Sequence, residues 1–293
     1  MTYDAVVLAD SPAAWWKLAD TSGSGTCADS SGGGHTGTPA NVTLGVTGPF
    51  TNSPSETAGS FNGSSSDVTS SYNPAGLTAF TVEAWVNLGN GNPGPYPRIV
   101  ANSYAESSNT GLELMLSGGG SGPWYPGAYI GNGTANTGVF SASAVPVTGW
   151  HQVAVTWSAG GNVLIYLDGA LAATSTGTLS GSMAAGPDGF SVGFQPAYNY
   201  DYFAGTIAQV SLYATALSGT RVAAHYAAGT APGSFAAGAS GTGSITVTGH
   251  KSDSGTAAVT GTGTDTAATP GGGSGGSVYA ATYASTYPLA SAS

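Results

Sequence analysis

Two stretches of the sequence decide the fold: Thr78-Ala79-Phe80-Thr81-Val82-Glu83-Ala84-Trp85-Val86, and further along Gly149-Trp150-His151-Gln152-Val153-Ala154-Val155-Thr156-Trp157 with Val163-Leu164-Ile165-Tyr166-Leu167-Asp168-Gly169. Side chains in both alternate between two faces, as they do along a β-strand. Asp-Gly at the end of the last run is a strong signal for a hairpin turn. Because both faces of these runs are fairly apolar, we expect them to be central strands.

The alternation also assigns faces to these strands. Phe80, Val82, Ala84 and Val86 share one side of the first strand. On the later strand the residues expected to face the core are Val153, Val155 and Trp157. These positions predict the centre of the hydrophobic core.

The whole of residues 1–229 reads as one domain. Short runs of β character are separated by Gly, Pro, Asn and Ser, which is typical of a sandwich. Strands are expected near residues 14–18, 60–61, 67–69, 80–88, 98–101, 112–116, 127–130, 150–157, 162–167, 170–175, 190–194 and 205–213. The one helix signal covers residues 218–226, where Ser218 can cap the start and Gly229 can end the helix. The prediction is an all-β, two-sheet antiparallel jelly-roll sandwich with one short helix.

Residues 230–293 have a different composition, dominated by Ala, Gly, Ser and Thr. Such a segment cannot bury enough apolar surface to offset its ordering entropy when alone. Its large anchors after the glycine-rich run 271–276 are Tyr279, Tyr283, Tyr287 and Leu289. We therefore expect a low-complexity C-terminal extension that serves assembly. It would dock on copies of this chain or on another protein of a larger assembly.

The charge composition excludes some partners. Only 6% of residues are charged, and 14 acidic against 4 basic residues give a net charge of −10. Nucleic-acid binding needs clustered cations, and the four basic residues are scattered through the sequence. We therefore expect neither nucleic acid nor an anionic membrane surface as a partner.

The N-terminal segment lacks the basic and apolar regions of a signal peptide, and no apolar run is long enough to span a membrane. The expectation is a protein made in a cytoplasm that does not use the usual secretion route. Cys27 is the one cysteine, so no intrachain disulfide can form, and we expect it to be a small buried residue.

The chain resembles the laminin-G-like (concanavalin A-like) jelly-roll domains over about residues 5–229. Six blocks occur in the family's order: the two opening stretches, Leu8-Ala9-Asp10-Ser11-Pro12-Ala13-Ala14-Trp15-Trp16-Lys17-Leu18, Asp29-Ser30-Ser31-Gly32-Gly33-Gly34-His35-Thr36-Gly37, Ser60-Phe61-Asn62-Gly63, and Gly205-Thr206-Ile207-Ala208-Gln209-Val210-Ser211-Leu212-Tyr213 with Ala216-Leu217-Ser218. The resemblance implies the jelly-roll fold. That fold hosts lectins, adhesion modules, spacers and glycan-cleaving enzymes, so function needs a separate argument.

The resemblance also implies a metal, because many relatives hold calcium at the rim of the sandwich. The loop at Asp29 matches one contributor, which makes Asp29 the candidate calcium ligand. The closing strand has Ala208-Gln209 where the family usually has Asp-Glu. Calcium needs six to eight hard oxygens, so this departure removes one carboxylate.

A looser resemblance concerns the organisation of the chain. A jelly roll at the start, no signal peptide and a Gly/Ser/Thr-rich tail are similar to minor tail or capsid-decorating proteins of bacteriophages that infect actinobacteria. This resemblance implies a virion surface protein whose partners are other virion proteins. The alternative is a bacterial surface or secreted carbohydrate-binding module, located outside the cell.

Catalytic patterns are absent from the sequence. Glycosidases need two carboxylates that flank the scissile bond, and jelly-roll glucanases carry them as Glu-x-Asp-x-x-Glu, which does not occur here. Glu83 and Glu113 stand alone on expected strands, and the four histidines have no metal-ligand spacing. The expectation is a non-enzymatic protein, with a glycan-cleaving enzyme as the weaker alternative.

Two aromatic loops are the candidate carbohydrate sites, because sugar rings stack on flat aromatic faces while Asn and Asp bind hydroxyls. The loops are residues 122–129 and 195–203. Their candidate residues are Trp124, Tyr125, Tyr129, Tyr198, Asn199, Tyr200, Asp201 and Tyr202. The same rings could instead cover the sandwich itself or pack against a neighbouring subunit, and the sequence leaves these possibilities open.

Overall fold

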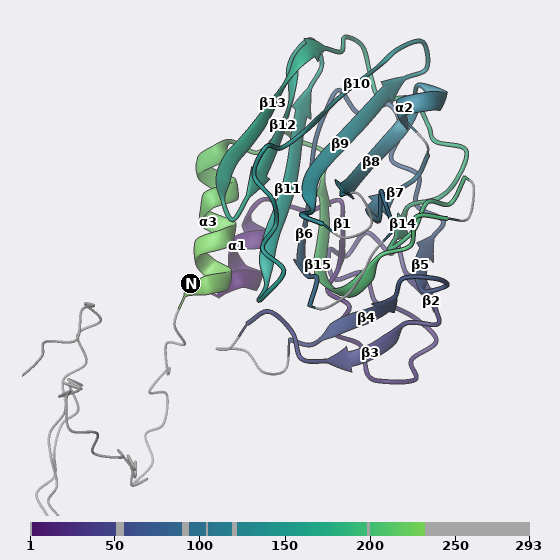
Figure 1. Ribbon diagram of the computed structural model, residues 1–293, viewed down its shortest axis with the longest axis vertical. Helices are drawn as coiled ribbons and strands as arrows, with labels where there is room; N and C mark the ends of the chain where they lie inside the picture. Colours follow the sequence, from purple (N-terminus) through teal and green to yellow (C-terminus); the bar gives the residue numbers. More distant parts are fainter. Residues whose placement is uncertain are drawn as a thin grey trace, which may run out of the picture. The chain divides into compact units, whose positions relative to one another are not determined.

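Fifteen strands within the described residues form two antiparallel sheets that pack against each other (Figure 1). The computed structural model describes residues 2–50, 56–89, 94–103, 105–118, 122–197 and 200–231. All of these belong to one compact unit, Met1–Phe235. The predicted all-β two-sheet sandwich is confirmed. The predicted extension at 230–293 lies outside the described residues except for its first two positions, and its role stays a prediction.

The first sheet has the strand order β13-β12-β11-β6-β15-β4-β3, and β1 also pairs with β15. Its strands are β1 (Ala14–Trp16), β3 (Thr43–Val46), β4 (Ala58–Asn62), β6 (Ala79–Asn87), β11 (His151–Ser158), β12 (Asn162–Leu167), β13 (Ala170–Thr178) and β15 (Ala204–Tyr213). The two opening stretches of the sequence are therefore β6, β11 and β12, which lie next to one another as their two apolar faces predict.

The second sheet has the order β10-β9-β8-β7-β14-β5-β2. Its strands are β2 (Gly37–Ala40), β5 (Asp67–Ser70), β7 (Arg98–Ala101), β8 (Thr110–Ser117), β9 (Tyr125–Asn132), β10 (Asn136–Phe140) and β14 (Ser191–Val192). One face of this sheet packs on the first sheet, and the candidate site lies on the other face.

The core between the sheets contains the predicted residues. Phe80, Val82, Ala84 and Val86 of β6 are each 0% exposed, and they belong to the same buried cluster as Val153, Val155 and Trp157 of β11. Cys27 is also buried as expected, and burial raises the pKa of its thiol to about 12.

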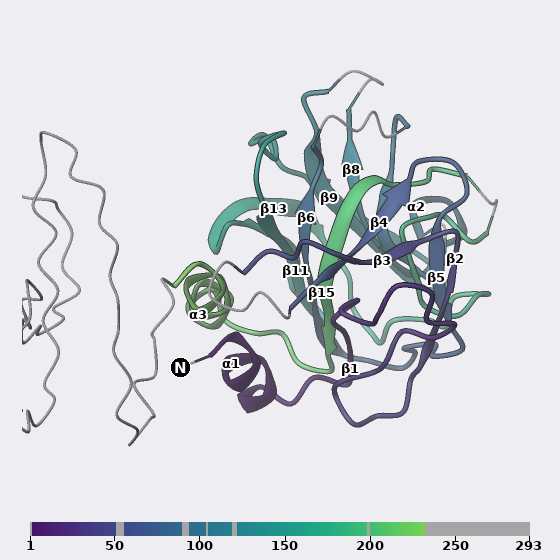
Figure 2. The same ribbon diagram turned by 90° about the horizontal axis from the view of Figure 1, so that it is seen from below.

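Helices cover the outer face of the first sheet. Helices α1 (Tyr3–Ala9) and α3 (Gly219–Thr230) lie side by side there (Figure 2), while the short α2 (Ala105–Ser108) precedes β8. The sequence predicted only α3. The spacing of Tyr3, Val6 and Val7, which are the buried residues of α1, is the signal that reveals it.

The predicted end of α3 at Gly229 is wrong, because the helix continues to Thr230. A Cβ placed on Gly229 would lie 2.4 Å from Cζ2 of Trp85. This glycine therefore allows close packing of the helix on the sheet instead of ending the helix. The predicted cap is confirmed, since the Ser218 side chain accepts a hydrogen bond from the Arg221 amide.

Three strands were not expected from the sequence: β2, β3 and β10. All three lie at the edges of their sheets, and each contains Gly within a short run, together with Pro in β2. Edge strands tolerate Pro and need only one apolar face, so their residue pattern is weak.

Candidate functional site

The first predicted aromatic loop is only partly at the surface. Trp124 is 2% exposed and packs in the core, where it forms an isolated β-bridge with Val145. The prediction of Trp124 as a sugar-stacking ring is therefore wrong, since a stacking ring must present a face to solvent. Tyr125 and Tyr129, on β9, are half-buried.

The second predicted loop reaches the surface at Tyr200, which is 39% exposed. Tyr202 stacks on Phe194, with ring centroids 5.5 Å apart and an interplanar angle of 17°. Burial raises the pKa of Asp201, although the nearby Arg98 opposes this shift. Tyr198 and Asn199 lie outside the described residues, so their role in this loop stays a prediction.

Arg98, at the start of β7, connects this loop to the sheet. Its Nη1 donates to Asp201 Oδ2 at 3.2 Å and to the carbonyl oxygen of Tyr96. Its Nε donates to Oε2 of Glu113 at 2.7 Å, and Nη2 approaches the same oxygen at 2.7 Å. One buried guanidinium therefore brings Tyr96, Asp201 and the middle of β8 together.

Glu113 is bonded at both carboxylate oxygens. Besides Arg98, the Gln195 side chain donates to Oε2 at 3.1 Å, and the backbone amide of Glu106 donates to Oε1 at 3.1 Å. Burial raises the pKa of Glu113 to about 7, although Arg98 pulls in the opposite direction. Glu113 is 0% exposed. It therefore positions its neighbours and has no contact with solvent through which it could act on a substrate.

Two aromatic rings on β9 and β10, next to Glu113 and its partners, pack over glycines on the outer face of the second sheet. Tyr129 lies directly across from Gly138, and Phe140 directly across from Gly127. A Cβ on Gly138 would come within 2.4 Å of the Tyr129 ring, and one on Gly127 within 2.1 Å of the Phe140 ring. Both rings are half-buried, and their centroids are 6.0 Å apart. The glycines thus let each ring cover the backbone with one face and leave part of the ring exposed.

Two exposed tyrosines lie in segments that Arg98 holds next to β8 and β9. The carbonyl of Tyr96, which is 47% exposed, accepts a hydrogen bond from Arg98, and Tyr200 precedes Asp201, which the same guanidinium binds. Burial raises the pKa of Tyr129, with further contributions from Glu106, Glu113 and Tyr96, so the phenol stays neutral and can donate a hydrogen bond. We call the set Tyr96, Tyr129, Phe140, Tyr200 and Asp201 the outer-face site.

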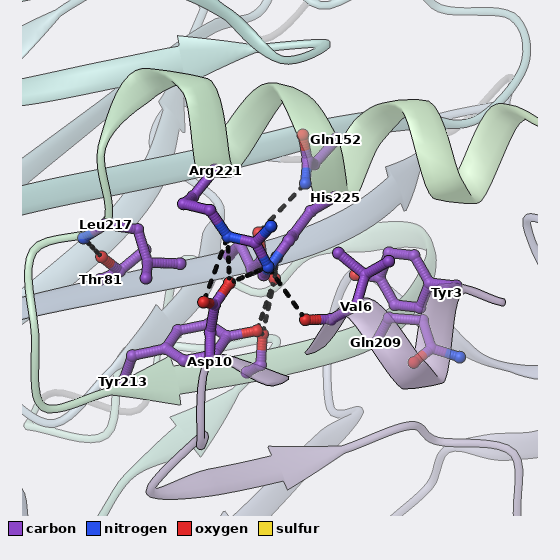
Figure 3. Close-up of polar contacts among 12 residues, drawn as sticks. Tyr3, Val6, Asp10, Thr81, Gln152, Gln209, Tyr213, Leu217, Arg221 and His225 are labelled. Atoms are coloured by element: carbon purple, nitrogen blue, oxygen red, sulfur yellow. Dashed lines mark hydrogen bonds and ion pairs between the residues drawn. The ribbon is translucent and has the colours of Figure 1, made fainter. Parts of the chain in front are cut away.

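A second polar cluster lies under helix α3 on the other sheet (Figure 3). His225 contacts Glu83 Oε1 through Nδ1 at 2.7 Å and Asp10 Oδ2 through Nε2 at 2.8 Å. Arg221 also binds Asp10, with Nη2 2.7 Å from Oδ2, and the Tyr213 hydroxyl donates to Glu83 at 2.9 Å. The cluster joins the loop after α1, strands β6 and β15, and α3.

Protonation of His225 explains this geometry. Burial disfavours the charged ring, but the hydrogen bonds to Glu83 and Asp10 outweigh burial and raise the pKa of His225. Burial also opposes ionisation of Asp10, yet bonds from Arg221 and His225 lower its pKa. With both ring nitrogens donating, His225 is 0% exposed and holds two carboxylates. Glu83 is also 0% exposed, and its role here is structural.

The loop at Asp29 is organised by hydrogen bonds to its carboxylate. Oδ1 accepts from the Trp15 amide, the Ser31 amide and the Ser31 hydroxyl, and Oδ2 accepts from the His35 amide. These bonds outweigh burial and lower the pKa of Asp29. Within the described residues no group of three His, Cys, Asp or Glu side chains is placed to hold a metal ion. This donor set fits calcium poorly, and calcium at Asp29 stays a prediction.

Two other histidines make local contacts. His151 Nδ1 contacts Asp168 at 2.7 Å, and Nε2 contacts the Thr148 carbonyl at 3.1 Å, so its role is structural. His35 stacks on Tyr72 with centroids 3.9 Å apart.

Sequence reasoning missed three residues of the site region: Tyr96, Arg98 and Phe140. Tyr96 stands between Pro95 and Pro97, and an aromatic residue between two prolines is a sequence signal for an exposed loop. Phe140 had no such signal, because its position depends on which glycine lies across the ladder. Arg98 looked like an isolated cation until the fold placed two carboxylates around it.

Comparison with known proteins identifies the fold family. The family model described as the concanavalin A-like lectin/glucanases superfamily matches residues 62–223. A sequence comparison with curated proteins gives no match. None of the helices in the described part of the chain is long and apolar enough to cross a membrane.

Several solved structures have the same fold. The binding domain of Paraclostridial Mosquitocidal Protein 1 matches with a TM-score of 0.53 at 15% identity, over 71% of this chain and 52% of that one. A structure from work on the ganglioside-dependent cell entry of botulinum neurotoxin type C matches with a TM-score of 0.53 at 14% identity, over 75% and 51%. The binding domain of botulinum neurotoxin serotype G gives 0.52 at 14% identity, over 73% and 50%.

The matches thus span about half the length of those structures, and at such low identity they establish the fold alone. The family match covers more than half of the chain, and it agrees with the two-sheet architecture built above. The chain has a lectin-like jelly-roll domain and belongs to the concanavalin A-like lectin/glucanases superfamily.

Proposed function

We propose that this protein binds carbohydrate, without cleaving it, through the outer-face site of its second sheet. The observation that carries the proposal is the pair of rings, Tyr129 and Phe140, that pack over Gly138 and Gly127 and keep part of each ring exposed. Flat aromatic surface beside polar groups is the chemistry that sugar binding requires.

Polar groups suited to sugar hydroxyls adjoin this aromatic surface. Asp201 is held by Arg98, and the neutral phenol of Tyr129 can donate. Because the Arg98 contacts fix the loop of Asp201 against the sheet, the site is pre-organised, which lowers the entropic cost of binding. The binding domains among the similar structures, one of them from a protein that interacts with gangliosides, support a binding role.

A non-enzymatic role is supported by the state of the carboxylates. Glu83 and Glu113 are both 0% exposed and fully engaged in hydrogen bonds. A glycosidase needs two carboxylates that reach the scissile bond. Neither buried glutamate has access to a sugar in this arrangement.

For the biological setting we propose the surface of a virion, in a tail or capsid-decorating position, with host-cell glycan as the target. This setting rests on the resemblance of the chain organisation to phage proteins, and a bacterial surface or secreted carbohydrate-binding module fits the outer-face site equally. Mass spectrometry of purified particles decides between them. Detection in particles supports the virion setting, and recovery only from host cell walls supports the module.

The binding function is tested by substitution of the ring that carries it. Phe140→Leu keeps an apolar side chain but removes the flat face, so binding to immobilised host cell-wall polysaccharide should weaken several-fold. Tyr200→Ala should act in the same direction. The matched control is Leu171→Ala, since Leu171 is 57% exposed on β13 of the other sheet. Unchanged binding in Phe140→Leu and Tyr200→Ala would contradict the proposal.

A further inference from the structure

All Lys and Arg side chains in the described part of the chain are already paired with carboxylates. Lys17 binds Asp4 and Glu56, and Arg221 binds Asp10. Arg98 binds Glu113 and Asp201. Lys251 lies outside the described residues.

Arg98 is 1% exposed and its guanidinium is occupied by Glu113, Asp201 and the Tyr96 carbonyl. It therefore lies beneath the outer-face site and cannot turn toward a ligand without abandoning two buried carboxylates. A buried charge that loses its partner is strongly unfavourable.

The carboxylates around the site exceed the cations. Glu113 and Asp201 bind the single guanidinium of Arg98, and Glu106 lies close enough to raise the pKa of Asp201 and, together with Glu113, that of Tyr129. The undescribed residues 90–93, 119–121 and 198–199 include no charged side chain. Among the described residues, the region thus carries an excess of negative charge, and each Lys and Arg is already paired with a carboxylate.

We infer that the outer-face site takes a glycan without acidic groups and rejects sialylated, uronic and phosphate-bearing glycans. The inference rests on the proposed carbohydrate-binding function and specifies its ligand class. An acidic sugar would lose hydration and meet only like charge, whereas a neutral sugar can stack on the rings and use Asp201 as an acceptor. Specificity arises here from repulsion as much as from attraction.

The test uses the full chain and glycans in matched pairs: dextran with carboxymethyl dextran, and N-acetyllactosamine with its sialylated form, within a wider panel of neutral polysaccharides and their carboxymethyl derivatives. We expect the acidic member of each bound pair to bind about tenfold more weakly, an effect of about 1.4 kcal/mol. The difference should shrink as salt is raised, because the screening length falls to about 3 Å at 1 M.

Glu106→Gln is the variant that reports on the mechanism. The side chain of Glu106 is half-buried, and its contacts to Glu113 and Asn136 are made by its backbone, so the substitution leaves them in place. It should strengthen binding of the acidic probe a few-fold and leave the neutral probe unchanged. Asp20→Asn, which removes a charge near β3 on the other sheet, is the control and should change neither.

The outcomes separate the two proposals. Equal or tighter binding of the acidic member overturns the inference about ligand class while the carbohydrate-binding function stands. Failure of the wild-type protein to bind any member of the panel overturns both. Preference for the neutral member that persists in high salt and in Glu106→Gln also overturns the inference, because the discrimination would then not be electrostatic.

Discussion

His225, in the last described helix, contacts Glu83, in the middle of the sandwich, at 2.7 Å across a sequence separation of 142 residues. Neither side chain is exposed. Asp10 completes the contact from the loop after α1, so the two ends of the domain are tied to its central strand by one imidazole. The helices that cover the first sheet therefore depend on a charged group that is buried and fully bonded (Figure 3).

His225→Ala should lower the free energy of unfolding by about 3–5 kcal/mol, because it leaves the carboxylate of Glu83 buried without its cationic partner. Urea unfolding followed by fluorescence gives the value. His35→Gln is the control, since His35 stacks on Tyr72 outside this cluster, and it should cost much less. Equal costs for the two variants would show that the cluster contributes little.

The same cluster predicts a pH dependence. The pKa of His225 is raised above its ordinary value of 6.5, so its contribution is full below that pH and is lost as pH rises through the raised pKa. The pKa of Asp10 is lowered from 3.8, so its contribution is present above that pH and is lost as pH falls. Stability from this cluster should therefore be greatest between pH 3.8 and 6.5.

The pH prediction is checked by unfolding curves of wild type and His225→Gln across this range. The difference between the two should be largest inside the window and should decrease on its alkaline side. A difference that grows with rising pH would have the wrong sign for a protonated His225.

Trp124 and Tyr200 should behave differently although both were candidates for sugar stacking. Trp124→Ala should cost about 3–5 kcal/mol of stability, because it empties a core position. Tyr200→Ala should leave the melting temperature nearly unchanged and weaken glycan binding, since Tyr200 is 39% exposed. Thermal unfolding and a binding assay on the same samples separate the two effects. A large stability loss in Tyr200→Ala would place that ring in the packing.

Asp29→Asn should lower stability by about 1–3 kcal/mol, because the amide nitrogen cannot accept the hydrogen bonds that one carboxylate oxygen accepts. Melting temperatures are compared with calcium and with a chelator. A calcium-dependent rise in the wild type that disappears in the variant would establish the predicted ion, and the stability loss itself is expected in both solutions.

Deletion of residues 271–293 should leave a folded jelly roll that no longer oligomerises or joins a particle. These residues include Tyr279, Tyr283, Tyr287 and Leu289, the predicted assembly anchors, which lie outside the described residues. Light scattering and particle incorporation measure the effect. Normal assembly of the shortened chain would place the contacts on the sandwich.

The sequence by itself determined the fold class and the core. Alternating apolar residues in β6 and β11 predict strands, because successive side chains of a strand point to opposite faces of the sheet. Both faces of these strands are fairly apolar, which predicts central positions. Short local signals also located the cap of α3 at Ser218 and the hairpin at Asp168-Gly169. The edge strands β2, β3 and β10 and the helix α1 were not predicted, because their apolar patterns are short and one-sided.

Only the tertiary structure decided which aromatic residues are at the surface and what the carboxylates do. Trp124 and Tyr200 are both aromatic residues in predicted loops, yet one fills the core and the other reaches solvent. Strand register across the second sheet places Arg98 next to Glu113. It also places the rings of Tyr129 and Phe140 side by side on the outer face. Such pairings join residues that are distant in the sequence or lie opposite each other in a ladder. Periodicity along one strand shows which face a side chain takes, but not which side chain lies across from it.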